Sequence, residues 1–142
     1  MLLVLDASVI AKWFKEEEGS VTALKIREDY YEGTHEIVVP DLLLYEIPNA
    51  LRYDKAFTKE LACKAAESLL EMGLVVSVPS IDLLTEAIKL GYEYNVTVYD
   101  AVYAALSVKA GGMFVTADDL LYGKIKNLKN CRLLSDIDPD DL

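Results

Sequence analysis

Five short apolar runs, separated by longer segments with helical periodicity, set the strongest limit on how this chain can fold. The runs cover residues 2–5, 37–39, 74–78, 113–116 and 131–134. Residues 2–5 and 37–39 are apolar without a break, and each of the other three runs contains one polar residue, a composition typical of strands buried on both faces. Parallel strands need long crossover connections, and helices usually supply them. The pattern therefore predicts a three-layer α/β/α fold around a central parallel sheet of four to five strands.

The segments between the runs carry the start and stop signals of helices. Ser8, Ser20 and Thr58 are candidate N-caps, and Gly73 stands where a helix commonly ends. Pro48 should kink or interrupt its helix, because it lacks a backbone N–H. The expected helices cover residues 8–17, 20–33, 42–54, 58–72, 80–94, a segment with Asp100 in its first turn that ends at Gly111, and 118–127.

Length and composition favour one domain over residues 1–142, ending in an acidic tail at about 136–142. Of the 142 residues, 53% are hydrophobic, which is enough for a sizeable core. The apolar runs are too short to span a membrane. The first residues lack the basic segment of a signal peptide, so we expect a cytoplasmic protein.

The net charge of −10 argues against the simplest kind of nucleic-acid binder, which would be basic. Part of the acidity is local, in Glu16–Glu18 and in the tail, and we interpret both as solvated surface. A polyanionic partner would have to be held by bound metal and by a local basic patch. That patch would consist of Lys124, Lys126, Lys129 and Arg132.

The few histidine and cysteine residues exclude several kinds of site. Cys63 and Cys131 are far apart and lack the spacing of metal ligands, so they should be free, buried thiols. The single histidine, His35, lies in a polar segment and is expected at the surface. A structural zinc site and a Ser-His-Asp arrangement are therefore both disfavoured.

Four acidic residues lie inside or beside apolar segments, where carboxylates are rarely found without partners: Asp6, Glu46, Asp100 and Asp118. At about 4 Å and an effective dielectric constant of about 20, each pair would repel by about 4 kcal/mol. No basic run lies nearby in sequence, so a divalent cation is the simplest remedy. Oxygen ligands favour Mg²⁺ or Mn²⁺.

These acids predict a catalytic metal site in which all four bind one or two such ions and position a water for attack on a phosphodiester. Ser8, Asn49 and Thr116 would orient the carboxylates. Other roles remain open for each acid taken alone.

Asp6 could simply cap a helix, and Asp100 could favour a helix macrodipole. Glu46 could be an ordinary helix glutamate. One member of the pair Asp118-Asp119 should be an N-cap and the other free, and Asp118 is the preferred ligand. The aromatic residues of the helices are interpreted as packing or as a face that meets a partner.

Four segments resemble PIN-domain proteins, and within that family the toxin ribonucleases of VapBC type. They are residues 4–14 with Asp6, 40–51 with Glu46, 99–106 with Asp100 and 114–118 with Asp118. The resemblance covers the whole domain in the right order. It implies a PIN-like fold, and the family's acidic quartet falls on the four acids already singled out. It also implies Mg²⁺- or Mn²⁺-dependent endonucleolytic cleavage of RNA, a homodimer, and a VapB-type antitoxin that blocks the site.

Two other classes of function remain open. A phosphohydrolase of haloacid-dehalogenase type also has an aspartate at a strand end, but it needs a second acid two residues later, where this chain has Ser8. A PIN domain that binds metal or a partner without turnover is the other alternative. A metal-dependent ribonuclease is the favoured interpretation, because the acidic quartet is complete.

Overall fold

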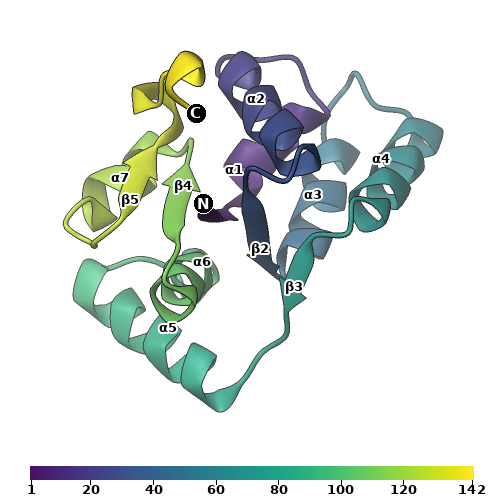
Figure 1. Ribbon diagram of the computed structural model, residues 1–142. Coiled ribbons are helices and arrows are strands. Elements are labelled where there is room, and N and C mark those ends of the chain that lie inside the picture. The colour runs from purple at the N-terminus through teal and green to yellow at the C-terminus, as the bar shows by residue number, and fades with distance from the viewer.

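The computed structural model describes residues 1–142 and contains one five-stranded, fully parallel sheet (Figure 1). The strand order is β3-β2-β1-β4-β5, with β1 at the centre. The strands are β1 (Leu2–Leu5), β2 (Glu36–Pro40), β3 (Val75–Ser77), β4 (Met113–Thr116) and β5 (Cys131–Leu133). The predicted α/β class and the parallel sheet are confirmed.

Helices cover both faces of the sheet. They are α1 (Ala7–Ile10), α2 (Ser20–Tyr31), α3 (Leu43–Arg52), α4 (Lys59–Glu71), α5 (Ile81–Tyr94), α6 (Val98–Ala110) and α7 (Asp119–Ile125), with 3-10 turns at Ala11–Trp13, Leu134–Asp136 and Pro139–Asp141. Crossovers between parallel strands are right-handed, so α1 to α4 cover one face, and α5 and α6 cover the other. None of these helices is long and apolar enough to cross a membrane.

The core is centred on β1, β4 and the inner side of α6. Val4, Leu5 and Phe114 are completely buried, and α6 packs on β1, β2 and β4. The small residues Ala104 and Ala105 of α6 are buried in this contact. The carboxyl ends of β1 and β4 are therefore anchored in the buried core.

Most predicted helix boundaries are confirmed, but the first helix differs. It is a short α1 followed by a 3-10 turn that ends at Trp13, and its N-cap is Asp6, not Ser8. The cap of α2 is Gly19, with a φ of 85°, and not Ser20. Pro48 does not end its helix, because α3 continues to Arg52. A proline removes one backbone hydrogen bond but leaves the packing of α3 in place.

Two predictions about buried side chains were wrong. His35 is buried, and its Nε2 lies 3.6 Å from Oδ2 of buried Asp29. Cys63 is exposed, whereas Cys131 is buried as expected. Strand β2 directly follows His35 and pairs with β1. This pairing places the histidine against α2, where it is buried. The acidic tail is largely exposed, as expected, although Ile137 and Leu142 pack against the core.

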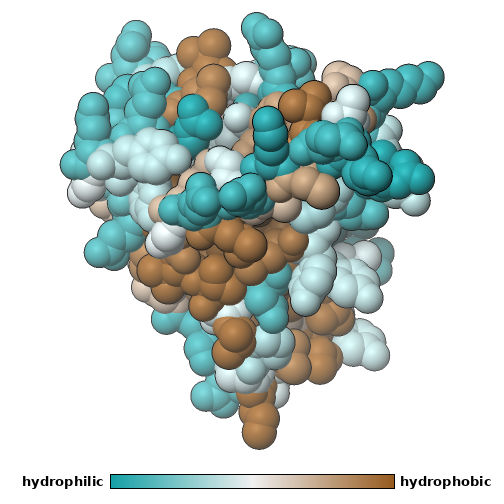
Figure 2. Space-filling view, turned by 90° about the vertical axis from the view of Figure 1, so that its right-hand side faces the viewer, coloured by the Kyte–Doolittle hydropathy of each residue, from teal (hydrophilic) through white to brown (hydrophobic).

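One side of the molecule exposes apolar side chains. Figure 2 views the side that carries α3, α4 and β3, and apolar residues gather in the middle of it. The exposed apolar residues of these segments include Leu70 (65% exposed), Val75 (60%) and Val78 (67%). Since β3 is also the last strand of the sheet, this side combines an apolar surface with an unpaired strand edge.

Candidate active site at the carboxyl edge of the sheet

The strand order creates a switch point beside β1. The chain runs from β1 outward to β2 and β3, then crosses back to β4 on the other side of β1. In open parallel sheets, ligands bind outside the carboxyl ends of the strands at such a point. Asp6 directly follows β1, and Asp118 follows β4 by two residues. The first turns of α3 and α6 carry Glu46 and Asp100.

Asp6 is held by hydrogen bonds at both carboxylate oxygens. Its Oδ1 accepts the backbone N–H groups of Ser8 (3.0 Å) and Val9 (3.3 Å) and the Ser8 hydroxyl. Its Oδ2 accepts the Thr116 hydroxyl at 2.6 Å, and the Ser8 hydroxyl oxygen in turn accepts the N–H of Ala117. Asp6 is only 6% exposed. Burial raises its pKa to about 6, although these hydrogen bonds act in the opposite direction.

Glu46 has a partner that sequence reasoning missed. The Tyr103 hydroxyl donates to Oε1 of Glu46 at 2.5 Å, and the tyrosine ring is buried. Burial raises the pKa of Glu46, the hydrogen bond from Tyr103 lowers it, and the charge of Asp100 raises it. Tyr103 was interpreted, with the other aromatic residues of the helices, as packing or as part of a face that meets a partner. Its position three residues after Asp100, on the same side of α6, is the signal that could have revealed it.

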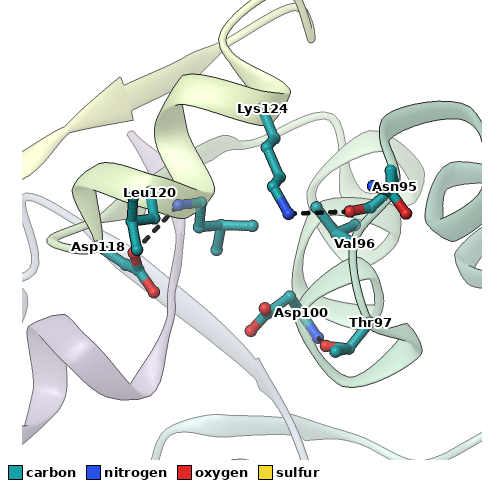
Figure 3. A pocket seen from close by; sticks show the side chains of 8 residues that line it. Asn95, Val96, Thr97, Asp100, Asp118, Leu120 and Lys124 are labelled. Carbon is teal, nitrogen blue, oxygen red and sulfur yellow. Dashed lines mark hydrogen bonds between the residues drawn. The ribbon is translucent and has the colours of Figure 1, made fainter.

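Asp100 and Asp118 face a cavity between α6 and α7 (Figure 3). Burial raises the pKa of Asp100, a hydrogen bond with Thr97 lowers it, the charge of Asp118 raises it, and that of Lys124 lowers it. Asp118 is the N-cap of α7, because its Oδ1 accepts the N–H of Leu121 at 3.0 Å. Its Oδ2 accepts no hydrogen bond and is available to a ligand.

Of the remaining predicted residues, some contact the four acids and others do not. Ser8 and Thr116 contact Asp6, as described above. Asn49 is exposed, and its side chain makes no hydrogen bond. Asp119 lines a different cavity, beside Gly19, and not the one that Asp100 and Asp118 face.

The negative charge of the four acids is offset only in part, by the charge of Lys124 acting on Asp100. None of Asp6, Glu46, Asp100 and Asp118 takes part in a salt bridge. No three of them close around a single point, so the quartet is not a preformed cage for one ion. Magnesium keeps several waters and needs only one or two protein carboxylates. The oxygen-only donor set and the uncompensated charge therefore fit Mg²⁺ or Mn²⁺.

The fold and this acidic edge define a protein of the PIN class. The chain belongs to the PIN-domain family, whose model, described as PIN domain, matches residues 3–124. A more particular likeness is to ribonuclease VapC3 of Pyrobaculum aerophilum. The two are 35% identical over 132 residues, which is 90% of this chain and 98% of that relative. The resemblance to VapC-type proteins is thereby confirmed.

Solved structures share the fold. VapC20 of Mycobacterium tuberculosis, described as a sarcin-ricin loop cleaving toxin, superposes with a TM-score of 0.65 at 17% identity, over 85% of this chain and 93% of that one. DNA-bound VapBC from Salmonella typhimurium gives a TM-score of 0.68 at 18% identity, over 94% of this chain and 97% of that one. At such identities the likeness shows the fold alone.

Proposed function

We propose that this protein is a Mg²⁺- or Mn²⁺-dependent endoribonuclease and the toxin of a toxin–antitoxin pair. The observation that carries the proposal is the set of four unpaired acids at the switch point of the sheet, in a chain that is 35% identical to a VapC ribonuclease. Burial raises the pKa of three of the acids, Asp6, Glu46 and Asp100. A site that gathers destabilised carboxylates is suited to binding a cation.

Asp6, Glu46, Asp100 and Asp118 would hold the ion. A divalent ion bound there would supply an activated water and charge stabilisation for phosphodiester hydrolysis. The chain's own residues then have defined tasks. Ser8 and Thr116 fix both oxygens of Asp6.

Glu46 is the proposed proton acceptor. Tyr103 holds its Oε1, and Oε2 remains free to take a proton from the attacking water. A carboxyl group whose pKa is raised above its ordinary value accepts a proton more readily than an ordinary one.

The proposed partners follow from the charge and the surface of the molecule. A VapB-type antitoxin would block the site, and the acidic pocket is complementary to a basic side chain from such a partner. The exposed apolar residues on the side that carries α3, α4 and β3 (Figure 2) support a homodimer through this side. An RNA target and a protein antitoxin are consistent with a cytoplasmic location.

Cleavage of a mixed pool of structured RNA tests the proposal. Purified protein should give discrete products with Mn²⁺ or Mg²⁺ and none with chelator. The Asp100→Asn variant should give none under any condition, while its circular dichroism matches that of the wild type. Lys109→Met, on the same helix but at its far end, is the matched control and should cleave normally.

The same preparation distinguishes the alternatives. A phosphohydrolase would release inorganic phosphate from small esters and leave RNA intact. A silent binding module would do neither while still binding metal. Either result would overturn the ribonuclease proposal.

A further inference from the structure

We propose that the cavity between the α5–α6 loop and α7 binds one nucleotide of single-stranded RNA beside the scissile phosphate, and that Lys124 contacts that nucleotide's phosphate. The inference rests on the proposed ribonuclease function and names a subsite within it. The cavity has a volume of about 360 Å³. This lies at the small end of the range for ligand pockets.

The cavity adjoins the acidic site directly. Asp100 and Asp118 form part of its wall, and Lys124 extends into it from α7, as Figure 3 shows. A substrate strand cut at the acids therefore has to pass this cavity. A nucleotide next to the cleaved bond is the part of the substrate that would lie there.

Lys124 is the only cationic side chain that lines the cavity. Its Nζ donates to the carbonyl oxygen of Asn95 at 3.2 Å and forms no salt bridge. An ammonium group has three donors, so two of them remain free. In a chain of net charge −10, a lysine left unpaired beside two carboxylates is placed to receive an anionic group that the substrate brings.

The rest of the lining suits a base. Val96 and Leu121 are at least partly buried and give an apolar floor, and Leu120 is 83% exposed at the rim. The amide of Asn95 adds one donor and one acceptor next to them. A half-open cavity of about 360 Å³ has room for one unstacked base, and unpaired bases are what sequence-specific RNA recognition commonly uses.

The salt dependence of binding separates a phosphate contact from a purely structural lysine. Each phosphate neutralised on a single strand changes the slope of log binding constant against log salt by about −0.7. Binding would be measured with a short RNA that contains the wild-type cleavage site. All proteins in this measurement would also carry Glu46→Gln, which slows cleavage of the RNA and does not alter a residue that lines the cavity.

Lys124→Met should weaken binding about three- to tenfold and reduce the slope by about 0.7. Lys124→Arg should restore both values. The control Lys89→Met removes the same charge from an exposed residue of α5, outside both the cavity and the basic patch, and should change neither. If the slope of Lys124→Met equals that of the wild type, or if Lys89→Met lowers it equally, the subsite is wrong.

A second variant tests the base side. Asn95 has a φ of 53°, a conformation that glycine adopts freely, so Asn95→Gly removes the amide without backbone strain. It should broaden the choice of nucleotide next to the cleavage site, as sequenced from the products of a mixed pool. An unchanged preference would contradict base contact in this cavity. Wild-type protein that cleaves no RNA would instead overturn the ribonuclease function itself, and the subsite with it.

Discussion

Asp6 affects the stability of the folded protein in two opposite ways. Its carboxylate caps α1 and accepts hydroxyl groups from Ser8 and Thr116, which favours the folded state. Its charge is also almost completely buried without a cation, and burial is the largest influence on its pKa. Burial outweighs the hydrogen bonds and favours the protonated form of Asp6. In the absence of metal, the charged carboxylate therefore destabilises the fold.

The stability of the metal-free protein should therefore rise as the pH falls through the pKa of Asp6. That pKa rises on folding from 3.8 to about 6, so the native state binds this proton more tightly than the unfolded chain. The charged Asp6 lowers the free energy of unfolding by its full amount above about pH 6. This effect disappears toward about pH 4, and it amounts to at most about 3 kcal/mol.

Urea unfolding in chelator, compared between wild type and Asp6→Asn, measures this effect. The variant keeps the cap and should be the more stable of the two at neutral pH by about 1–3 kcal/mol, and it should have no activity. The difference should shrink as the pH falls. A difference that stays constant with pH would show that the charge of Asp6 does not cause it.

Tyr103→Phe should impair catalysis without unfolding the protein. Burial raises the pKa of the tyrosine hydroxyl, so it stays protonated and donates to Glu46. Without this donor the pKa of Glu46 rises further, because the lost hydrogen bond favoured the carboxylate. A hydrogen bond to a charged group contributes about 1.5–3 kcal/mol, so cleavage should fall about tenfold or more at neutral pH.

The pH–rate profile is the decisive measurement for Tyr103→Phe. Its acidic limb should move to higher pH, while the melting temperature stays near that of the wild type because the ring still packs against Phe114. A lower rate with an unshifted acidic limb would indicate that the tyrosine acts through packing alone.

At the level of the helix, Asp118 combines a cap with a proposed ligand, and two substitutions separate these roles. Asn is as good an N-cap as Asp, so Asp118→Asn should retain stability while RNA cleavage is lost. Asp118→Ala should lose both, at a cost of about 1 kcal/mol in the free energy of unfolding. Asp119→Asn is the matched control and should cleave RNA normally. Loss of cleavage in Asp119→Asn with normal activity in Asp118→Asn would reverse the assignment.

Elements with local signals could be predicted from sequence, and elements fixed by distant contacts could not. Thr58 caps its helix as expected, and Gly73 follows the end of α4 with a φ of 73°. The burial of His35 depends on its contact with Asp29 and on the pairing of β1 with β2. The residues next to His35 in sequence are polar, so the sequence alone does not indicate this burial.

The candidate site shows the same division. Asp6 with Ser8 is a local pattern at a strand end, so its acid and its hydroxyl were both identified. The contact of Tyr103 with Glu46 joins residues 57 positions apart, and it forms only because α3 and α6, on opposite faces of the sheet, both begin at its carboxyl edge. Asn49 was selected for its spacing from Glu46, but its side chain is exposed.

For the whole molecule, the exposed apolar side is the feature that an isolated chain explains least well. β3 is a short edge strand with exposed Val75, and Leu70 of α4 and Val78 are exposed with it. Exposed strand edges and apolar patches commonly mark a surface that another chain covers. The homodimer proposed above would cover this side.

Leu70→Lys and Val75→Lys should therefore each shift the protein from dimer to monomer in sedimentation equilibrium, because a buried lysine without a partner opposes association. Val21→Lys is the matched control, since Val21 is 75% exposed but lies on α2, away from β3. It should leave the dimer intact. The acidic site lies at the carboxyl edge and uses residues of one chain only, so the monomeric variants should still bind Mn²⁺. A wild type that is monomeric at all concentrations, or a dimer that both lysine variants leave unchanged, would exclude this side as the interface.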